Sequence, residues 1–314
     1  MTSTFEAAPS ITAIDTNMFG RPKATSAYLV EADQPALIET GSTTVIPELR
    51  AGLEELGVGP GDLAHIVVTH IHLDHAGGAG TLAPHFPSAS IWVHERGAPH
   101  LADPTRLMAS AERIYGAEGL RTLFGAVEPV PEDRLRPLTD GDLIDLGSRT
   151  LTALYTPGHA SHHVALRDSG TGGVFVGDAL GVYLPDVRIL RPATPPPEFN
   201  LEQAVESVER IRDVEPSAIL FSHFGPVAEV DHITSLAVRR MERWTDVVAG
   251  AMERTEDLDE VTALLAEGTA QELNPADDER REAIGDRYEL LSSVKMNAMG
   301  LMRYLRKKRE AAES

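Results

Sequence analysis

The sequence T-H-I-H-L-D-H-A-G-G at residues 69–78 places four candidate metal ligands within six positions. It follows the run H-I-V-V at 65–68, whose apolar residues are typical of a strand buried on both faces. A lone histidine usually has a structural role, but three with an intervening carboxylate favour metal binding. The candidates are His70, His72, Asp74 and His75. Because alternate residues of an extended chain point the same way, His70 and His72 are expected to chelate one ion, and Asp74 and His75 to face a second.

The composition limits the chemistry of such a site. The 314 residues include no cysteine, which excludes disulfides, thiolate metal sites and cysteine nucleophiles. Histidine and carboxylate ligands suit zinc as the default metal, and also manganese or iron. The formal net charge of −20 disfavours a nucleic-acid partner, because such binding depends on neutralising phosphates with Lys and Arg.

Length and hydropathy predict a large globular protein. No apolar run approaches the roughly 20 residues of a membrane span, and the first 20 residues lack the basic and apolar regions of a secretory signal. We therefore expect no membrane association and a cytoplasmic location. The change from alternating strands and helices to a helical pattern predicts a catalytic domain at 1–230, with an insertion at about 96–131, and a helical extension at 231–314 packed on it.

Residues with ligand chemistry recur where predicted strands end. The predicted strands are 11–14, 26–32, 36–39, 65–69, 89–95, 149–155, 163–168, 172–178 and 217–223. A helix is predicted from Ile46 to Leu56, closed by Gly57, and another begins after Asn200, which with Gln203 forms a capping pattern. Helical apolar periodicity after Asp231 and from 291 to 305 predicts the helices of the tail.

The histidine-rich segment resembles the signature of the metallo-β-lactamase superfamily, in the form found in glyoxalase II and lactonase-type members. Three further segments follow in the family's order: T-P-G-H-A-S-H-H at 156–163, V-F-V-G-D at 174–178 and L-F-S-H-F-G-P at 220–226. L-I-E-T-G at 37–41 resembles the family's L-I-D-T-G turn, with Glu39 in place of the usual Asp. The resemblance spans about residues 10–230 and implies an α/β fold, a four-layer αββα sandwich with metals at one edge, followed here by a C-terminal helical extension.

The resemblance also implies a set of seven ligands to two metal ions. His70, His72 and His159 would hold the first ion, and Asp74, His75 and His223 the second. Asp178 would bridge both ions beneath a shared water or hydroxide, so that Asp74 and Asp178 are the protein residues expected to take part in catalysis. His162 and His163, just beyond His159, are candidates to orient ligands or to have a structural role.

The expected reaction is hydrolysis of an ester, lactone or thioester bond of a small molecule by this hydroxide. The alternative is a phosphodiesterase or phosphotriesterase on the same site, since two-metal sites serve both reactions. An iron-dependent oxygenase or oxidoreductase is disfavoured because all seven ligand positions are filled, and the same completeness disfavours a non-catalytic metal-binding module. No G-x-S-x-G pattern surrounds Ser222, which argues against a serine hydrolase.

Substrate specificity is expected to come from loops. Seven side chains near ligand-bearing strand ends or in the insertion are candidate pocket walls, with ordinary packing as the alternative for each: Phe19, Arg106, Tyr115, Tyr183, Phe199, Phe221 and Phe224. The apolar stripe of the helical tail is a candidate homodimer contact.

Overall fold

The computed structural model describes residues 3–185, 187–273, 285 and 288–313. The chain divides into two compact units, each treated by itself. The first comprises residues up to 155, 162–177 and 216–228, and the second comprises 156–161, 178–215 and the residues from 229 onward. The second unit therefore takes in segments that precede residue 230, and the predicted domains at 1–230 and 231–314 remain a prediction.

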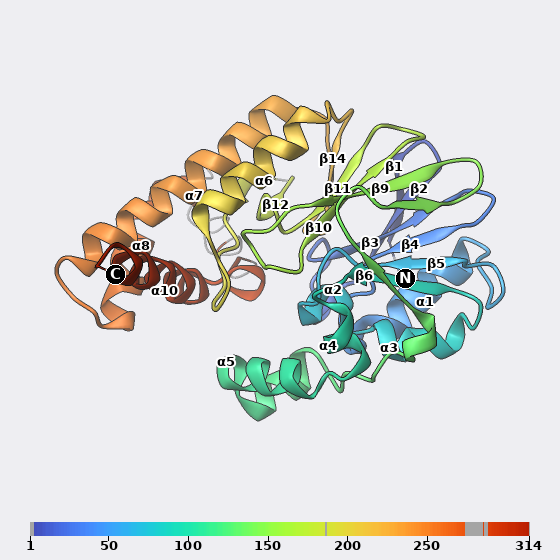
Figure 1. The fold of residues 1–314 in the computed structure, drawn as a ribbon, viewed down its shortest axis with the longest axis horizontal. Coiled ribbons are helices and arrows are strands. Elements are labelled where there is room, and N and C mark those ends of the chain that lie inside the picture. Colours follow the sequence, from blue (N-terminus) through green and yellow to red (C-terminus); the bar gives the residue numbers. More distant parts are fainter. Residues whose placement is uncertain (1–2, 186, 274–284, 286–287, 314) are drawn as a thin grey trace. The chain divides into compact units, whose positions relative to one another are not determined.

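A seven-stranded sheet in the first unit carries the histidine-rich segment. Its strands lie in sequence order: β1 Thr4–Ala8, β2 Ile11–Asp15, β3 Ser26–Val30, β4 Ala36–Ile38, β5 His65–Val67, β6 Ser90–His94 and β7 Leu135–Leu138 (Figure 1). The strands from β1 to β4 pair antiparallel, and those from β4 to β7 pair parallel. Parallel strands end at the same edge, so the segment leaving β5 lies beside the segment leaving β6.

A six-stranded sheet in the same unit supplies a second edge with site residues. Its order is β15 Gly225–Val227, β14 Ile219–Phe221, β11 Val174–Gly177, β10 Val164–Asp168, β9 Thr150–Tyr155 and β8 Leu143–Asp145. Only the β11–β14 pair of this sheet is parallel. His223 follows β14, and the backbone N–H of Val164 in β10 donates to the carbonyl of Thr69 at 2.8 Å. The second sheet therefore meets the histidine-rich loop directly.

Two apolar clusters hold the first unit together. One lies between the sheets and includes Tyr28 and Val67 from the first sheet with Phe175 and Leu220 from the second. The other lies on the opposite face of the first sheet, which is covered by helices. These helices are α1 Ile46–Glu55, α2 Leu73–Ala76, α3 Ala79–Leu82, α4 Ala98–Ala102 and α5 Thr105–Leu123. Three of the four expected layers, one helical and two of sheet, therefore lie within this unit, and the segment 96–131 contains α4 and α5.

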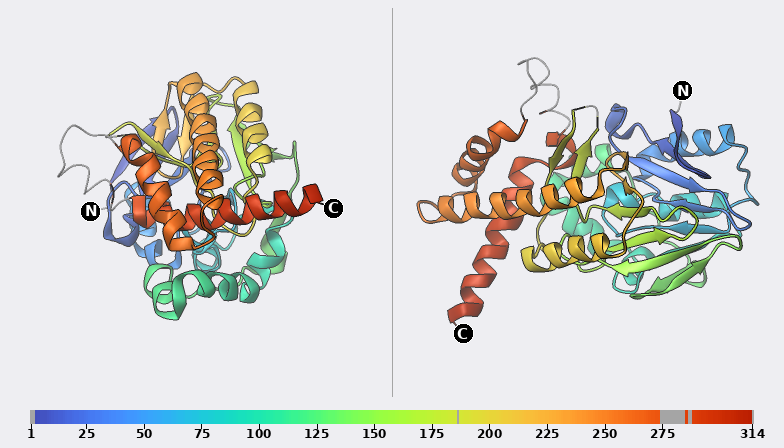
Figure 2. Two further views of the ribbon diagram at one scale, coloured as in Figure 1. Left: turned by 90° about the vertical axis from the view of Figure 1, so that its left-hand side faces the viewer. Right: turned by 90° about the horizontal axis from the view of Figure 1, so that it is seen from above.

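The second unit is mainly helical. It contains the hairpin β12 Val182–Leu184 with β13 Ile189–Arg191, and the helices α6 Leu201–Asp213, α7 Val230–Met252, α8 Leu258–Thr269 and α10 Val294–Glu313. Helices α6 and α7 run side by side (Figures 1 and 2), and α7 also contacts α8 and α10. The side chain of Asn200 accepts a hydrogen bond from the backbone of Gln203 at 2.9 Å, as the sequence predicted for the start of α6. Residues 274–284 and 286–287 of the predicted helical tail lie outside the described residues.

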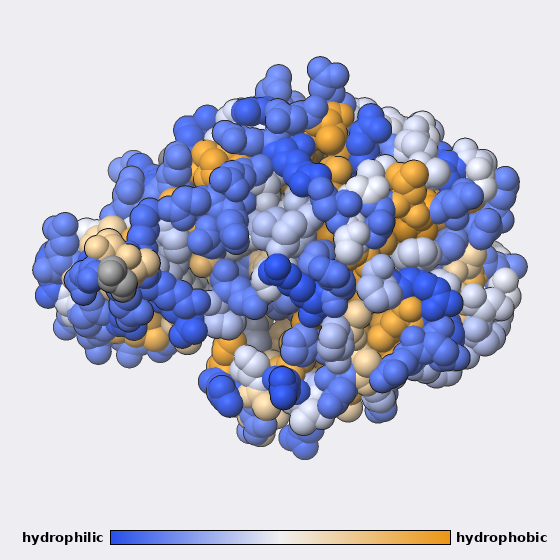
Figure 3. Space-filling model, in the orientation of Figure 1, coloured by the Kyte–Doolittle hydropathy of each residue, from blue (hydrophilic) through white to orange (hydrophobic). Residues whose placement is uncertain are grey.

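Short 3₁₀ turns connect these elements: Met18–Gly20, Thr43–Val45, Ala83–His85, Glu132–Arg134 and Ala270–Leu273. Among the residues that the structure describes, no helix has the length and apolar character needed to cross a membrane. The face drawn in Figure 3 is mostly hydrophilic, in keeping with the high content of acidic residues.

Candidate metal centre

The loop between β5 and α2 gathers the local ligands. Helix α2 begins directly after His72, so Asp74 and His75 lie in its single turn. Gly78 follows the helix, and a Cβ at this position would lie 2.5 Å from Cδ1 of Ile46 and 3.2 Å from the carbonyl oxygen of Ser42. The glycine therefore lets the loop pack closely against the start of α1.

Three side chains of the first unit form a compact set of ligand atoms. Asp74 Oδ2 lies 3.6 Å from Nε2 of His75 and 3.4 Å from Nε2 of His223, and the two nitrogens are 3.2 Å apart. Two ligands about 2.1 Å from a tetrahedral ion are about 3.4 Å from each other. Both histidines are fully buried, whereas 22% of the Asp74 side chain is exposed. These three residues are the predicted second metal site, and their spacing fits one divalent ion.

Hydrogen bonds fix which nitrogen each of these histidines presents. His75 Nδ1 lies 3.1 Å from a carboxylate oxygen of Glu39, and His223 Nδ1 lies 2.9 Å from the carbonyl oxygen of Ala24. Because these oxygens only accept, each Nδ1 carries the proton and each neutral ring presents a lone pair at Nε2. With both rings neutral, the two Nε2 lone pairs face each other beside the Asp74 carboxylate, an arrangement that a bound cation stabilises. The donor set therefore fits a metal.

Glu39 is a buried carboxylate that connects the ligands of both predicted sites. It accepts hydrogen bonds from the Thr69 hydroxyl at 2.6 Å, the Thr69 backbone N–H at 3.2 Å and the Ser222 hydroxyl at 3.0 Å. Since the Thr69 hydroxyl donates to Glu39, its oxygen accepts from Nδ1 of His70 at 3.0 Å, which leaves Nε2 of His70 for a metal. Glu39, His70 and His75 also form a group of closely spaced candidate ligands, but these contacts show Glu39 orienting the histidines through their Nδ1 atoms.

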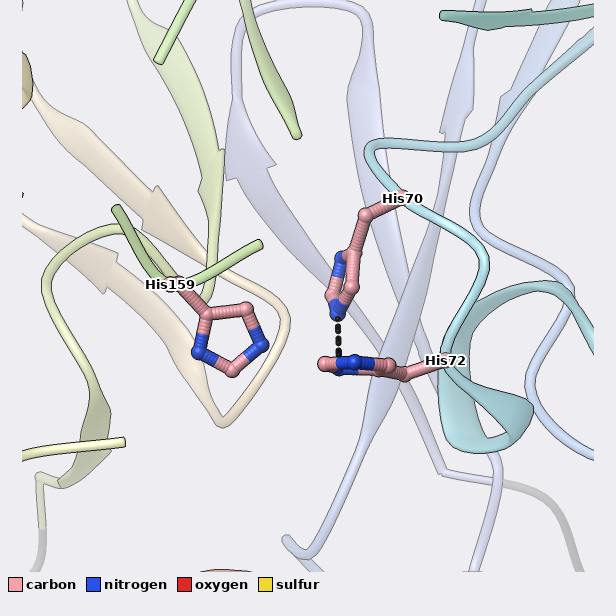
Figure 4. Close-up of side chains that lie close together, drawn as sticks. All are labelled: His70, His72 and His159. Atoms are coloured by element: carbon pink, nitrogen blue, oxygen red, sulfur yellow. Dashed lines mark hydrogen bonds between the residues drawn. The ribbon is translucent and has the colours of Figure 1, made fainter. Parts of the chain in front are cut away.

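The first predicted site is represented in the first unit by His70 and His72. Nε2 of His70 lies 3.0 Å from Nδ1 of His72 (Figure 4), and the ring centroids of His70 and His75 are 4.1 Å apart. His70 is fully buried and His72 is partly exposed. Five of the seven predicted ligands are therefore brought together within the first unit.

The other two predicted ligands, His159 and Asp178, belong to the second unit. Nε2 of His159, whose ring is also drawn in Figure 4, lies 3.5 Å from Oδ2 of Asp178. Nδ1 of His159 donates to the carbonyl oxygen of Ala193 at 2.9 Å, which again leaves Nε2 for a metal. The histidine and the carboxylate are thus adjacent and oriented as two ligands of one ion would be.

Buried neighbours of the ligands had only weak signals in the sequence. The ring centroids of His163 and His70 are 5.0 Å apart, and Nδ1 of His162 accepts a hydrogen bond from the backbone N–H of Ile71 at 3.4 Å. Thr69 and Ser222 were not predicted as part of the site. Their one signal is position, because each immediately precedes a ligand.

The candidate pocket residues have different environments. Phe221 is fully buried in β14, Phe224 packs on Phe5 with ring centroids 5.6 Å apart, and Arg106 is exposed on α5. Tyr183 in β12 is 7% exposed. The rest are Phe199, which packs on Tyr304, and Phe19 and Tyr115, which both contact Phe124.

A sandwich of two sheets with closely spaced histidines and carboxylates at its edge defines an α/β protein with side chains that could hold a metal ion. Residues 20–223 match the family model described as the metallo-beta-lactamase superfamily. This match covers more than half of the chain, and the protein belongs to that superfamily.

Curated relatives align over part of their own length. A metallo-beta-lactamase fold-containing protein, ST1585, of Sulfurisphaera tokodaii is 30% identical over 53% of this chain and 62% of its own. The acyl-coenzyme A thioesterase MBLAC2 of Gallus gallus is 34% identical over 40% of this chain and 44% of its own. A hydroxyacylglutathione hydrolase of Aeromonas salmonicida is 30% identical over 37% of this chain and 32% of its own.

Solved structures agree on the fold. The crystal structure of ST1585, described as an archaeal metallo-beta-lactamase superfamily protein, superposes with a TM-score of 0.67 at 21% identity, covering 94% of this chain and 98% of that one. The predicted fold class, a metallo-β-lactamase fold of sheets and helices with C-terminal helices, is confirmed.

Proposed function

We propose that this protein is a hydrolase that uses two divalent metal ions to cleave a thioester, ester or lactone bond of a small molecule. Membership of the superfamily and the hydrolase names of two relatives support a metal-dependent hydrolase. The observation that carries the proposal is the convergence of Asp74 Oδ2, His75 Nε2 and His223 Nε2 within 3.6 Å of one another.

The proposed ligand set has seven members. His70, His72 and His159 hold one ion, Asp74, His75 and His223 hold the other, and Asp178 is shared. All seven fall within the matched residues 20–223, and the spacing of His159 and Asp178 in the second unit supports including that pair. Zinc is the proposed metal, because nitrogen and oxygen ligands at tetrahedral spacing suit it.

Two bound ions would supply a hydroxide nucleophile near neutral pH and a positive charge for the developing oxyanion. The protein's own residues keep the ligands in place for this chemistry. Glu39 and the carbonyl of Ala24 hold the ring protons of His75 and His223 on Nδ1. Asp74 is the most exposed member of its site, so we place the substrate's approach on its side.

Thioesters come first among the proposed substrates. One relative is named an acyl-coenzyme A thioesterase and another a hydroxyacylglutathione hydrolase, and both names describe the release of an acyl group. The metal ligands alone do not discriminate between acyl and phosphoryl substrates, since two-metal sites serve both. Phosphodiesters and phosphotriesters therefore belong in the same assay.

The experiment combines metal analysis with a substrate panel. Protein purified without added metal is analysed for zinc, manganese and iron, then assayed with thioesters, esters, lactones and phosphoesters. Asp178→Ala, purified identically, controls for contaminating hydrolases. About two equivalents of zinc with acyl-substrate turnover that is absent in the variant supports the proposal. Turnover of phosphoesters alone would replace the substrate class, and one iron with oxygen uptake would overturn the hydrolase.

A further inference from the structure

Three aromatic side chains of the first unit, here called the aromatic wall, contact one another although they are distant in sequence. The ring centroids of Phe19 and Phe124 are 5.8 Å apart and those of Tyr115 and Phe124 are 4.9 Å apart, both in edge-to-face geometry. Phe124 is 4% exposed and Phe19 is partly buried, whereas Tyr115 is 38% exposed. A buried ring thus supports two rings that remain accessible to solvent.

Hydrogen bonds tie this wall to the metal-binding loop. The hydroxyl of Thr43 lies 3.0 Å from the carbonyl oxygen of Gly77, at the end of α2, and 2.7 Å from that of Ala126. The hydroxyl of Thr44 donates at 2.9 Å to the carbonyl of the residue before Phe124. The two threonines therefore fix the backbone on both sides of Phe124 relative to the helix that carries Asp74.

Electrostatics agrees with this placement. Partial burial raises the pKa of the Tyr115 phenol, and the negative charge of Asp74 contributes to the increase.

We propose that Phe19, Tyr115 and Phe124 form a specificity subsite that receives an aromatic group of the substrate next to the scissile bond. The inference rests on the proposed hydrolytic function and adds to it the chemical class of the substrate. An aromatic ring is favoured over an alkyl chain because it packs edge-to-face or offset against other rings, and each such pair adds roughly 2- to 13-fold to a binding constant beyond area burial. The connection to α2 favours a substrate group over a second protein as the occupant.

The kinetic test uses thioesters of equal carbon number. Phenylacetyl and octanoyl methyl thioesters vary the acyl side, and acetyl thioesters of benzyl mercaptan and heptanethiol vary the thiol side. We expect the wild type to prefer the aromatic member of at least one pair by about 10-fold in kcat/KM. Tyr115→Leu, which keeps apolar volume but removes the ring, and Phe19→Leu should bring that ratio close to one.

Two measurements show whether the variants fold and bind metal as the wild type does. Thermal unfolding and metal content should match the wild type in Tyr115→Leu, since this side chain is the most exposed of the three. Leu143→Ala is the matched control, because Leu143 is an exposed apolar residue of β8 with 61% exposure, and it should leave the ratio unchanged.

A binding measurement separates this inference from the proposed function. Phenylacetate and octanoate are titrated calorimetrically into the metal-loaded wild type and Tyr115→Leu. Binding of phenylacetate that weakens about 10-fold in the variant, with little change for octanoate, supports the subsite even if no thioester is turned over. Equal preference for alkyl and aromatic members in both thioester pairs, or phenylacetate binding that is unchanged in the variant, would overturn it.

Discussion

Nδ1 of His75 lies 3.1 Å from Oε1 of Glu39, and both side chains are completely buried. The same carboxylate accepts hydrogen bonds from Thr69 and Ser222, the residues that precede the ligands His70 and His223. One carboxylate therefore orients or adjoins ligands on two separate segments of the chain. The family usually has an Asp at the position of Glu39. The Glu side chain is longer by one methylene group and reaches His75, Thr69 and Ser222.

Replacing this carboxylate by an amide should weaken metal binding. In Glu39→Gln one oxygen becomes an NH₂ donor, which faces the donors of His75, Thr69 or Ser222 in a fully buried site. We expect metal affinity to fall about 10- to 100-fold, the usual effect of losing a group that orients a ligand. A competition titration with a chromophoric chelator measures it, with the exposed Glu48→Gln as the matched control. Unchanged affinity in Glu39→Gln would show that the orienting hydrogen bond is dispensable.

Removing a ligand should abolish activity with little effect on folding. His72 is partly exposed, so His72→Ala loses little packing, while kcat/KM should fall by at least about 10³-fold, or about 4 kcal/mol. Asp178→Ala should behave in the same way. Steady-state kinetics and metal analysis test this together with circular dichroism. Full turnover in either variant at reduced metal content would contradict the proposed ligand set.

Gly177, one residue before Asp178, should tolerate no side chain. Its φ is +48°, and a Cβ would lie 2.5 Å from the Thr69 hydroxyl oxygen and 2.6 Å from Nε2 of His163. Gly172 has a similar φ of +75° but no neighbour closer than 3.7 Å. Gly172→Ala should therefore cost about 1–2 kcal/mol for the backbone conformation alone, and Gly177→Ala about 1–3 kcal/mol more for the overlap. Urea unfolding compares the two, and equal losses would exclude a steric role for this glycine.

The sequence was most informative where the chemistry is local. Residues 70–75 present their ligands by the geometry of one loop, and the strand before them, β5, was predicted from its apolar run. The N-cap of α6 and the helix ending before Gly57, whose φ is +79°, also followed from local rules. Strand β1 was missed, because T-F-E-A-A carries little alternation and none of its residues is fully buried.

Contacts between distant segments could not be derived from residue patterns. That Glu39 would reach Ser222, 183 residues away, depends on the two sheets packing face to face. The wall formed by Phe19, Tyr115 and Phe124 likewise depends on where α5 ends relative to the threonines after β4. The recurrence of His and Asp at strand ends drew attention to the distant ligands, but only the family resemblance assigned them to metal ions, because isolated histidines and aspartates are common in any sequence.

Metal removal should lower thermal stability. The Nε2 atoms of His75 and His223 lie 3.2 Å apart, as two ligands of one ion would. An ion that binds only the folded state stabilises it by mass action. At a free metal concentration about 100 times the Kd the gain is about 2.7 kcal/mol, a Tm shift of a few degrees for a chain of this size. Differential scanning calorimetry with and without EDTA, followed by zinc readdition, measures the shift. A Tm that does not respond to either step would argue against a bound metal.

Acid should destabilise the first unit through His65, which is not a predicted ligand. Burial lowers the pKa of His65 and outweighs the opposing effect of Asp145, and Nε1 of Trp92 donates to Nδ1 of His65 at 3.0 Å, a bond that needs an unprotonated nitrogen. The folded state therefore binds this proton less readily than the unfolded state, whose histidine pKa is about 6.5. The contribution of neutral His65 is complete above that value and is lost as the pH falls below it, by at most about 1.4 kcal/mol per pH unit.

Urea unfolding followed by tryptophan fluorescence between pH 7.5 and 5.5 should show a smaller loss of unfolding free energy in His65→Gln than in the wild type. The exposed His232→Gln is the control for removing one histidine, and identical slopes in wild type and His65→Gln would rule out this group as a source of acid sensitivity.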